Sequence, residues 1–338
     1  NFEGPSTYKS NIALNLQFAN GYDVRFEYNK DSVNKALMWK DLSYSEEGTL
    51  ADGRALLDQR ENPYLTNTGE GGGEAFSIIA TKAFDNGVNL YAGYTNMEME
   101  DASRVASAQA DSAYNKQPHD LAGENLRAAP SDFMVDDKLI IGLDYTTQIF
   151  GTNDTRFSVL ANRKSGRRYS LVYETGNSEN SITDGNWEAY DLIYVPTGVN
   201  DPNVVFASDA VASSVMNFLS SGCAAGFSGQ IMTRNACKGD YATRVDLRIT
   251  QDFQVNDDQK IVIYFDIQNL INFLDDDKGW QTEIDTNSVS RAVSVDLDQT
   301  TDSGQLYITG VNEDAGLIYS TDYGQSQWQM NLGISYKF

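Results

Sequence analysis

The last eleven residues of the chain alternate strictly between apolar and polar side chains. The even-numbered positions are apolar: Trp328, Met330, Leu332, Ile334, Tyr336 and Phe338. The odd-numbered positions are polar or small: Gln329, Asn331, Gly333, Ser335 and Lys337. Successive side chains of a strand point to opposite faces, so this pattern predicts one strand with one apolar face. Because free termini usually fray, a terminal Phe338 needs an apolar environment. A lipid-facing strand of a β-barrel supplies one, and an edge strand of a soluble β-sandwich is the alternative.

The same alternation recurs upstream in pairs of runs joined by short turns. The turns lie at Asn20–Gly21, 85–87, 151–154 and 256–258, and Asn-Gly is a strong hairpin signal because both residues tolerate positive φ. Long polar segments separate the pairs, at about 45–73, 99–136, 176–240 and 274–324. Outer-membrane barrels show this order of tight periplasmic turns and long extracellular loops. We therefore predict an antiparallel transmembrane β-barrel section of about nine strands over residues 1–338.

Phenylalanines mark one end of the predicted hairpins. Each strand that enters a short turn reaches one at or just before the turn, and the last strand ends on one: Phe18, Phe84, Phe150, Phe253 and Phe338. One aromatic level is typical of an interfacial girdle. Single-chain bacterial barrels have an even number of strands, so an odd count of about nine predicts the C-terminal part of a larger barrel.

Three local patterns add further expectations. The last long loop contains a predicted hairpin, Ala292–Asp296 with Leu306–Thr309. The return strand after residue 154 is predicted to continue in phase through Tyr169, Leu171 and Tyr173. Gly69-Glu-Gly-Gly-Gly73 lacks the Lys-Ser/Thr of a phosphate loop and is predicted to be a flexible loop tip.

Composition excludes several classes of function. The chain of 338 residues has 48 acidic against 25 basic residues, a net charge of -23, which argues against a nucleic-acid partner. No stretch approaches the ~20 consecutive apolar residues of a membrane helix. The single histidine, His119, is expected to be a solvated loop residue, and no nucleophile motif lies near it. We predict no enzymatic activity, no catalytic residue and no bound organic cofactor.

Two loop features are candidates for structural or metal-binding roles. Cys223 and Cys237 lie fourteen residues apart, and in an exported protein they are predicted to form a disulfide. The carboxylates of Asp275, Asp276 and Asp277 form the densest acidic cluster. Calcium binds such oxygen ligands, and a solvated loop without metal is the alternative.

Aromatic residues gather in the longest loop. Trp187, Tyr190 and Tyr194, with Phe206, lie among polar residues. Exposed aromatic side chains of this kind form recognition surfaces for a substrate. They are equally consistent with a small core of the loop itself, packed around Cys223 and Cys237.

Two segments near the C-terminus carry a family resemblance. Phe265–Asn272, F-D-I-Q-N-L-I-N, is similar to an element near the penultimate strand of TonB-dependent outer-membrane transporters. Asp246–Phe253 and the following L-D-D-D-K-G-W segment resemble the Oar-like branch more specifically. The spacing Asn331-x-Gly333-x-x-Tyr336-x-Phe338 resembles the C-terminal signal read by the barrel-assembly machinery. Residues 8–44 and 240–338 carry the resemblance.

This resemblance implies an outer-membrane location in a Gram-negative bacterium and a barrel of about 22 or more strands. It also implies an N-terminal plug, a TonB box and energised transport. No segment of this sequence looks like a plug or a TonB box. The implied partners are therefore the N-terminal plug and barrel portion of the same precursor, the TonB complex through that portion, the barrel-assembly machinery and outer-membrane lipid.

Three functions follow as expectations. The first is the barrel portion of a TonB-dependent transporter or receptor, with extracellular loops that capture substrate. The second is a structural or adhesive surface barrel without energised transport. The third is a soluble secreted β-sandwich that acts as a binding module.

Overall fold

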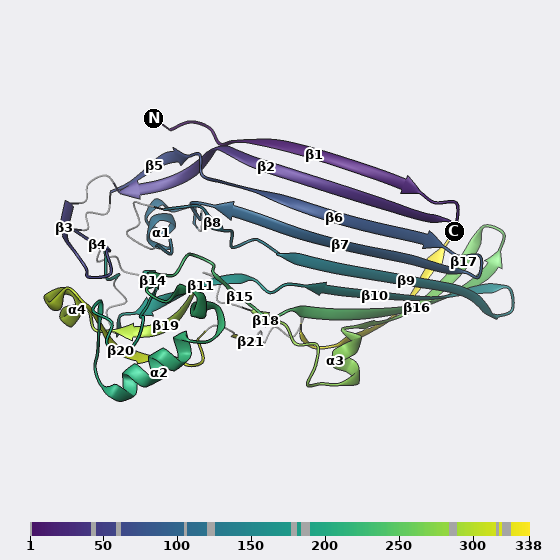
Figure 1. Cartoon of the computed structure of the whole chain (residues 1–338). Helices are drawn as coiled ribbons and strands as arrows, with labels where there is room; N and C mark the ends of the chain where they lie inside the picture. The colour runs from purple at the N-terminus through teal and green to yellow at the C-terminus, as the bar shows by residue number, and fades with distance from the viewer. Residues whose placement is uncertain are drawn as a thin grey trace.

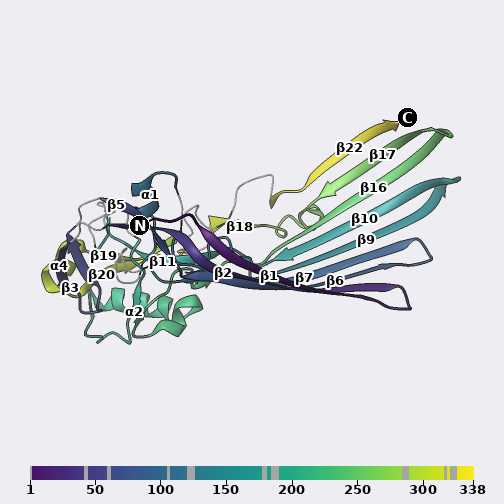
Figure 2. The same cartoon turned by 90° about the horizontal axis from the view of Figure 1, so that it is seen from above.

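The computed structural model of the chain describes residues 2–41, 45–58, 62–104, 107–119, 126–176, 181–183, 190–283, 289–315, 318–319 and 326–338. Two parts are evident: a broad sheet of long strands, and a compact body at one end of the strands (Figure 1). In the view from above, the strands extend away from this body, and the C-terminus lies at their far end (Figure 2). We call the compact body the loop domain.

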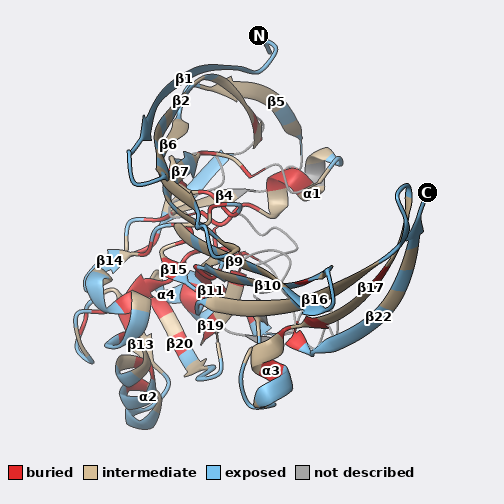
Figure 3. Ribbon diagram, turned by 90° about the vertical axis from the view of Figure 1, so that its right-hand side faces the viewer, coloured by how far each residue is buried: buried red, intermediate tan, exposed pale blue. Residues whose placement is uncertain are grey.

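Nine long strands form the main path of the large sheet, each antiparallel to the next: β1 (Ser6–Gln17), β2 (Tyr22–Asp41), β6 (Gly71–Ala83), β7 (Val88–Asp101), β9 (Asp137–Phe150), β10 (Asn153–Lys164), β16 (Ala242–Asn256), β17 (Gln259–Gln268) and β22 (Gln329–Lys337). Short β5 (Pro63–Thr68) and β8 (Ala129–Pro130) pair with β2 and β7. The predicted antiparallel all-β class is confirmed. The sheet is curved, and its edge strands β1 and β22 lie apart (Figure 3). No pairing joins them among the described residues.

The strand register places the predicted apolar residues on one continuous surface. On β10, Phe157 lies between Tyr145 of β9 and Ile249 of β16. The same row continues through Phe265 of β17 to Leu332 of β22. None of these side chains is buried, and Leu332 retains 75% of its accessible surface. We call this surface the apolar face. A face this large and this exposed needs an apolar partner.

The other side of the sheet, which we call the polar face, carries charged pairs within and between strands. The Arg248 guanidinium donates to both carboxylate oxygens of Asp266, at 2.6 and 2.7 Å. Arg244 donates to Asp246 at 2.8 Å and to the side chain of Gln268 at 3.1 Å. Alternation between these two faces is the pattern of a strand with unlike surroundings on its two sides.

Phenylalanines lie at the turn end of the strands, as predicted. Phe18 and Phe84 close two hairpins through backbone bonds to Tyr22 and Val88, each 2.8 Å long. Phe150 and Phe253 lie 6.3 Å apart between ring centroids. Phe338 is 94% exposed at the chain end. The turn end of the sheet is therefore aromatic and unburied within this chain.

The glycine-rich segment is not a flexible tip. Gly71–Gly73 form the start of β6, between β2 and β7. A Cβ on Gly72 would lie 2.6 Å from the Asp31 carbonyl oxygen, and one on Gly73 would lie 2.6 Å from that of Glu98. Gly72 also has a φ of 138°. Glycine is needed because the neighbouring backbones leave no room for a side chain.

The return strand β10 does not continue through residue 173. It ends at Lys164, and β11 (Arg168–Glu174) leaves the large sheet for the loop domain. There β11 pairs in parallel with β19 (Val289–Val295). The prediction was wrong because Leu171 and Tyr173 continue the alternation but are apolar for another reason: both are buried in the loop domain.

The loop domain is built around a second sheet, in the order β13 (Val204–Phe206), β20 (Leu306–Val311), β19, β11 and β15 (Cys237–Lys238). The predicted hairpin near 292–309 is confirmed as β19–β20, and it belongs to this sheet. Helix α2 (Asp209–Leu219) packs beside the sheet with Ala212, Val215 and Leu219 buried.

Smaller elements complete the chain: β3 (Ser45–Thr49), β4 (Ala55–Asp58), α1 (Ala110–Asn115), β12 (Tyr194–Val195), η3 (Gly222–Phe227), β14 (Gln230–Ile231), α3 (Leu270–Leu274), β18 (Thr282–Glu283), α4 (Leu297–Ser303) and β21 (Ile318–Tyr319). In the part of the chain that the structure describes, no helix is both long enough and apolar enough to span a membrane.

Candidate functional site

The long loops fold together around a common core. Buried side chains come from residues far apart in sequence, including Leu50, Tyr173, Ile193, Val215 and Leu306. Loop 99–136 joins them through backbone bonds: His119 N donates to the Tyr190 carbonyl at 3.2 Å, and Leu192 N donates to the His119 carbonyl at 2.9 Å. All four predicted loops therefore contribute to one body.

The predicted aromatic recognition surface is wrong for two of its three residues. Tyr190 is 1% and Tyr194 is 4% exposed. The Tyr194 hydroxyl donates to Asp201 at 3.0 Å and accepts from Asn203 at 2.8 Å. Trp187 lies outside the described residues. Tyr190 and Tyr194 serve the core of the loop domain, which is the alternative that the sequence left open.

His119 is buried, contrary to the expectation of a solvated loop residue. Its Nδ1 donates to the Gln117 carbonyl at 2.8 Å, and its Nε2 lies 3.2 Å from Asp191 Oδ1. The Thr183 hydroxyl also lies 3.0 Å from Nε2, but it donates to Asp191 at 2.6 Å. A general base would have to accept the hydroxyl proton. The contacts of His119 therefore link loop 99–136 to loop 176–240.

Asp191 is the centre of this buried polar cluster. Burial alone would raise its pKa, but the charges of His119 and Arg54 and the hydrogen bonds from His119 and Thr183 outweigh burial, so the pKa lies well below its usual range. Ser181 Oγ and the Ile182 amide each donate to Oδ2 at 2.8 Å. The ionised carboxylate therefore holds three segments of the loop domain in place.

This pKa shift predicts an acid-labile loop domain. A carboxyl whose folded pKa is depressed stabilises the fold above its unfolded pKa of about 3.9, and that stabilisation is lost as the pH falls through the folded pKa. We expect D191N to destabilise the domain at neutral pH and to reduce the loss of stability below about pH 4. Urea unfolding at neutral and acid pH measures both effects, with exposed D209N as the control. Parallel pH profiles for D191N and the wild type would contradict the prediction.

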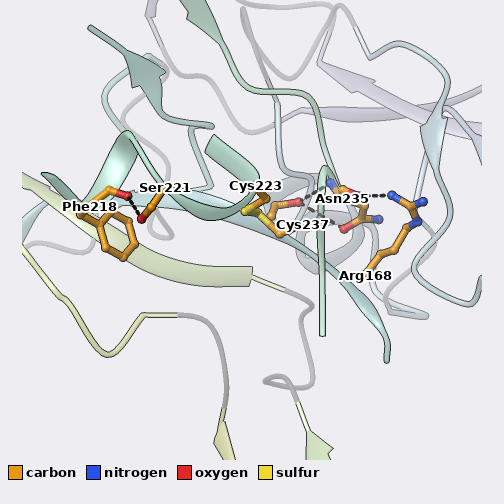
Figure 4. Close-up of a disulfide and its surroundings, with 7 residues drawn as sticks. Arg168, Phe218, Ser221, Cys223, Asn235 and Cys237 are labelled. Carbon is orange, nitrogen blue, oxygen red and sulfur yellow. Dashed lines mark hydrogen bonds between the residues drawn. A yellow bond between two sulfur atoms is a disulfide. The ribbon is translucent and has the colours of Figure 1, made fainter. Parts of the chain in front are cut away.

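The predicted disulfide is present. Cys223 and Cys237 are bonded with a Cα separation of 5.1 Å, and Cys237 is fully buried in the core (Figure 4). Nearby, Asn235 accepts from the Ser170 hydroxyl at 3.2 Å and donates to Asp132 at 2.5 Å. The bridge therefore joins η3 to the segment that contacts loop 99–136.

Removing this bridge is expected to weaken the loop domain. A closed loop of fourteen residues stabilises a fold by roughly 3 kcal/mol in the chain-entropy model. We expect the C223S/C237S variant to lose about 3 kcal/mol of unfolding free energy. Urea unfolding, monitored by the hydrogen exchange of the amides of β11 and β19, measures this loss. The hairpins of the large sheet serve as an internal control and should exchange as before. Unchanged exchange in β11 and β19 would show that the bridge is dispensable.

The carboxylates of Asp275–Asp277 lie together, as a calcium site requires. One oxygen from each residue lies within 4.8 Å of the others. Lys278 Nζ lies 2.5 Å from Asp275 Oδ2, and this hydrogen bond lowers the pKa of Asp275. The ammonium group competes with a cation for that oxygen. A calcium site predicts binding heat in calorimetry that increases in K278Q, whereas a solvated loop predicts no heat in either protein.

The resemblance motif forms a closed turn after β17. Asn269, at a φ of 53°, donates to the Gly279 carbonyl at 3.0 Å and to that of Ser326 at 2.7 Å. Asn272 donates to the Lys278 carbonyl at 2.7 Å. These amides satisfy backbone acceptors where the strand leaves the sheet.

The residues of the predicted assembly signal lie on both faces of the edge strand β22. Asn331 pairs with Asp266 and Gly333 with Tyr264 on the polar face. A Cβ on Gly333 would lie 2.2 Å from Tyr264 Cζ, so the ring covers the glycine. Tyr336 and Phe338 are exposed, with ring centroids 6.1 Å apart. An assembly role for these residues stays a prediction.

Two solved structures are similar to this chain in outline. BauA, the ferric preacinetobactin receptor from Acinetobacter baumannii, is 12% identical with a TM-score of 0.41; the match covers 98% of this chain and 29% of the receptor. The NanC porin is 8% identical with a TM-score of 0.19, over 78% of this chain and 81% of the porin. No protein-family model matches, and the comparison with curated proteins finds no match. The chain thus spans under a third of that receptor.

Proposed function

We propose that this chain is the C-terminal part of an outer-membrane β-barrel of a Gram-negative bacterium, with the loop domain on the outside of the cell. The observation that carries this proposal is the apolar face, bounded by aromatic side chains at both ends. Phe18, Phe84 and Phe150 lie at the turn end, and a second set lies toward the loop domain: Tyr28, Phe76 and Tyr94, each exposed.

The spacing of the two aromatic sets supports a membrane. Phe76 on β6 lies eight residues before Phe84, which directly follows the strand. On β9, Leu139, the partner of Tyr94, lies eleven residues before Phe150. At ~3.3 Å per residue and a tilt of ~40°, these spans have a height of roughly 20–28 Å. The apolar band of an outer-membrane barrel is ~25 Å tall. Beyond the band the same face becomes acidic on β6 and β7, at Glu74, Glu98 and Glu100.

Within that setting, the function that the sequence resemblance favours is TonB-dependent transport or reception, with substrate captured by the loop domain. The plug, the TonB contact and the remaining strands would come from the N-terminal portion of the same precursor. The polar face, with pairs such as Arg248–Asp266, would then line the barrel interior. Members of the barrel-assembly machinery would read the C-terminal strand.

Labelling of single cysteines tests the orientation. We expect a membrane-impermeant maleimide to label S213C, on exposed α2, in intact cells. N20C, in the exposed turn between β1 and β2, should label only after the outer membrane is permeabilised. The native cysteines are bonded to each other and do not compete. A soluble secreted module would label at both positions without permeabilisation and would fractionate without detergent.

A display or adhesion barrel is the second candidate, and one observation favours it. The loops form a body with its own core and disulfide, which a surface-display protein needs and a substrate gate does not. Purification of the chain from native outer membranes separates the two. A retained plug-bearing polypeptide supports the receptor, and a complete barrel without one supports display.

A further inference from the structure

Among the described residues, one arginine on the outward side of the sheet has no carboxylate partner, and it lies at the level where the apolar face ends. Arg163, near the end of β10, pairs with Leu139 of β9 and Thr243 of β16. It has the same parity as Ala161 and Val159, so its side chain emerges on the apolar face. Leu139 in turn pairs with Tyr94, a member of the aromatic set that lies toward the loop domain. Arg163 therefore lies at the upper boundary of the apolar band.

The Arg163 side chain is stacked on an exposed tyrosine. Its Cζ lies 4.5 Å from the ring centroid of Tyr241, which is 41% exposed. Lys238 Nζ lies 5.3 Å from the same centroid. The Tyr241 hydroxyl donates to Asp137 at 2.7 Å, which fixes the ring. The ring thus holds two cations close together on the outer surface.

Two of the three carboxylates nearby are engaged with other groups. Asp136 receives two hydrogen bonds from Arg168, at 2.9 and 2.8 Å, and lies 3.3 Å from Lys238. Asp137 accepts from Tyr241, and Asp240 precedes Tyr241 in the sequence. Across the residues that the structure describes, Arg163 forms no ion pair. Its guanidinium is free to bind an anion.

The neighbouring strands carry side chains of the opposite charge on the same side of the sheet. On β6 and β7 the outward side chains beyond the level of Tyr94 are Glu74, Glu98 and Glu100, and they repel anionic headgroups. The Arg163–Tyr241 pair at β9, β10 and β16 is a cationic and aromatic site in a chain of net charge -23. Arginine beside tyrosine suits the headgroup level of a membrane, where a guanidinium binds phosphate bidentately.

We propose that Arg163, Tyr241 and Lys238 form a binding site for the phosphate group of an outer-leaflet lipid. The site rests on the proposed membrane orientation, because the phosphate would lie just above the apolar band. The Arg163 guanidinium would donate to the phosphate oxygens, and Lys238 would add charge. Tyr241 would orient both cations and contact the headgroup.

Retention of a phosphorylated lipid tests the site. The full chain, folded in detergent with trace lipid A, is repurified, and bound lipid phosphorus is counted per protein. One cationic residue near an anionic lipid surface changes binding about fivefold, so we expect R163Q to retain about fivefold less lipid A. R163K should restore most of it. R156Q is the matched control, because Arg156 is an exposed arginine on the same strand but on the polar face.

The outcomes separate this site from the proposed function. Insertion of wild type, R163Q and R156Q into phosphatidylcholine vesicles, each together with the remaining barrel portion of the precursor, reports the membrane fold alone, and a wild type that does not insert would overturn the proposed function. Normal insertion with equal lipid A retention in R163Q and R156Q would overturn the site.

Discussion

Replacing Arg54 with methionine is expected to open the loop domain, with the largest stability loss of any single change in it. The Arg54 side chain is fully buried, and its Nε donates to Asp52 Oδ2 at 2.8 Å. Its Nη2 donates to the Leu192 carbonyl, and its Cζ lies 5.2 Å from the Tyr173 ring centroid. One side chain thus connects loop 45–73 to β11 and to loop 176–240.

The expected loss has a clear physical origin. R54M leaves the Asp52 carboxylate, whose side chain is 0% exposed, buried without its cation. Breaking a buried pair by removing one partner costs about 3–5 kcal/mol. The charge of Arg54 also contributes to the low pKa of Asp191, so R54M weakens the His119–Asp191 cluster as well.

A double variant distinguishes the pair from the packing. Replacing both members of a buried ion pair with uncharged groups costs much less than replacing one, so R54M/D52N should recover a large part of the stability. Hydrogen exchange of the amides from Tyr190 to Val195 measures the opening of the domain in detergent. Equal exchange in R54M and R54M/D52N would show that Asp52 is not the group left unpaired.

The sequence predicted the large sheet because each side of it has a single kind of environment. Residues such as Leu247, Phe265 and Leu332 alternate with Arg248, Asp266 and Asn331, and two-residue periodicity records that difference directly. The turns could be predicted equally well, because Asn-Gly favours a hairpin turn, and Gly21 has a φ of 83°. Local pattern was sufficient wherever the neighbouring strand is also the neighbour in sequence.

The loop domain could not be predicted in the same way. Its strands pair across large sequence separations and in parallel, as β11 with β19 and β13 with β20. His119 and Asp191 are 72 residues apart, and Arg54 and Leu192 are 138 apart. Each of these polar residues looks like a solvated loop residue until its partner is known. Usable signals came from the β19–β20 hairpin, whose pairing is local, and from the Cys223–Cys237 pair, because oxidation chemistry limits its choices.

The second large effect concerns the apolar face, and adjacent isoleucines of β9 provide the comparison. Ile141 lies between Ala92 and Ala161 on the apolar face, whereas Ile140 lies between Gly93 and Asn162 on the polar face. If the apolar face contacts lipid, I141R places a cation inside the apolar band, two residues from its boundary at Leu139. A cation on the lipid face costs about 2–4 kcal/mol at the middle of the band and less toward its boundaries, whereas substitutions on the interior face are tolerated.

We therefore expect I141R to lower the yield of folded protein in vesicles and to lower its urea midpoint, with I140R close to wild type. The two variants share the strand, the residue type and the introduced charge, so their difference reports the side of the sheet alone. In a soluble sandwich the apolar face would be the core. I141R would then fail to fold in buffer as well as in vesicles, and the wild type would fold in buffer without lipid. A wild type that folds only in lipid, with I141R impaired and I140R intact, assigns the apolar face to the membrane.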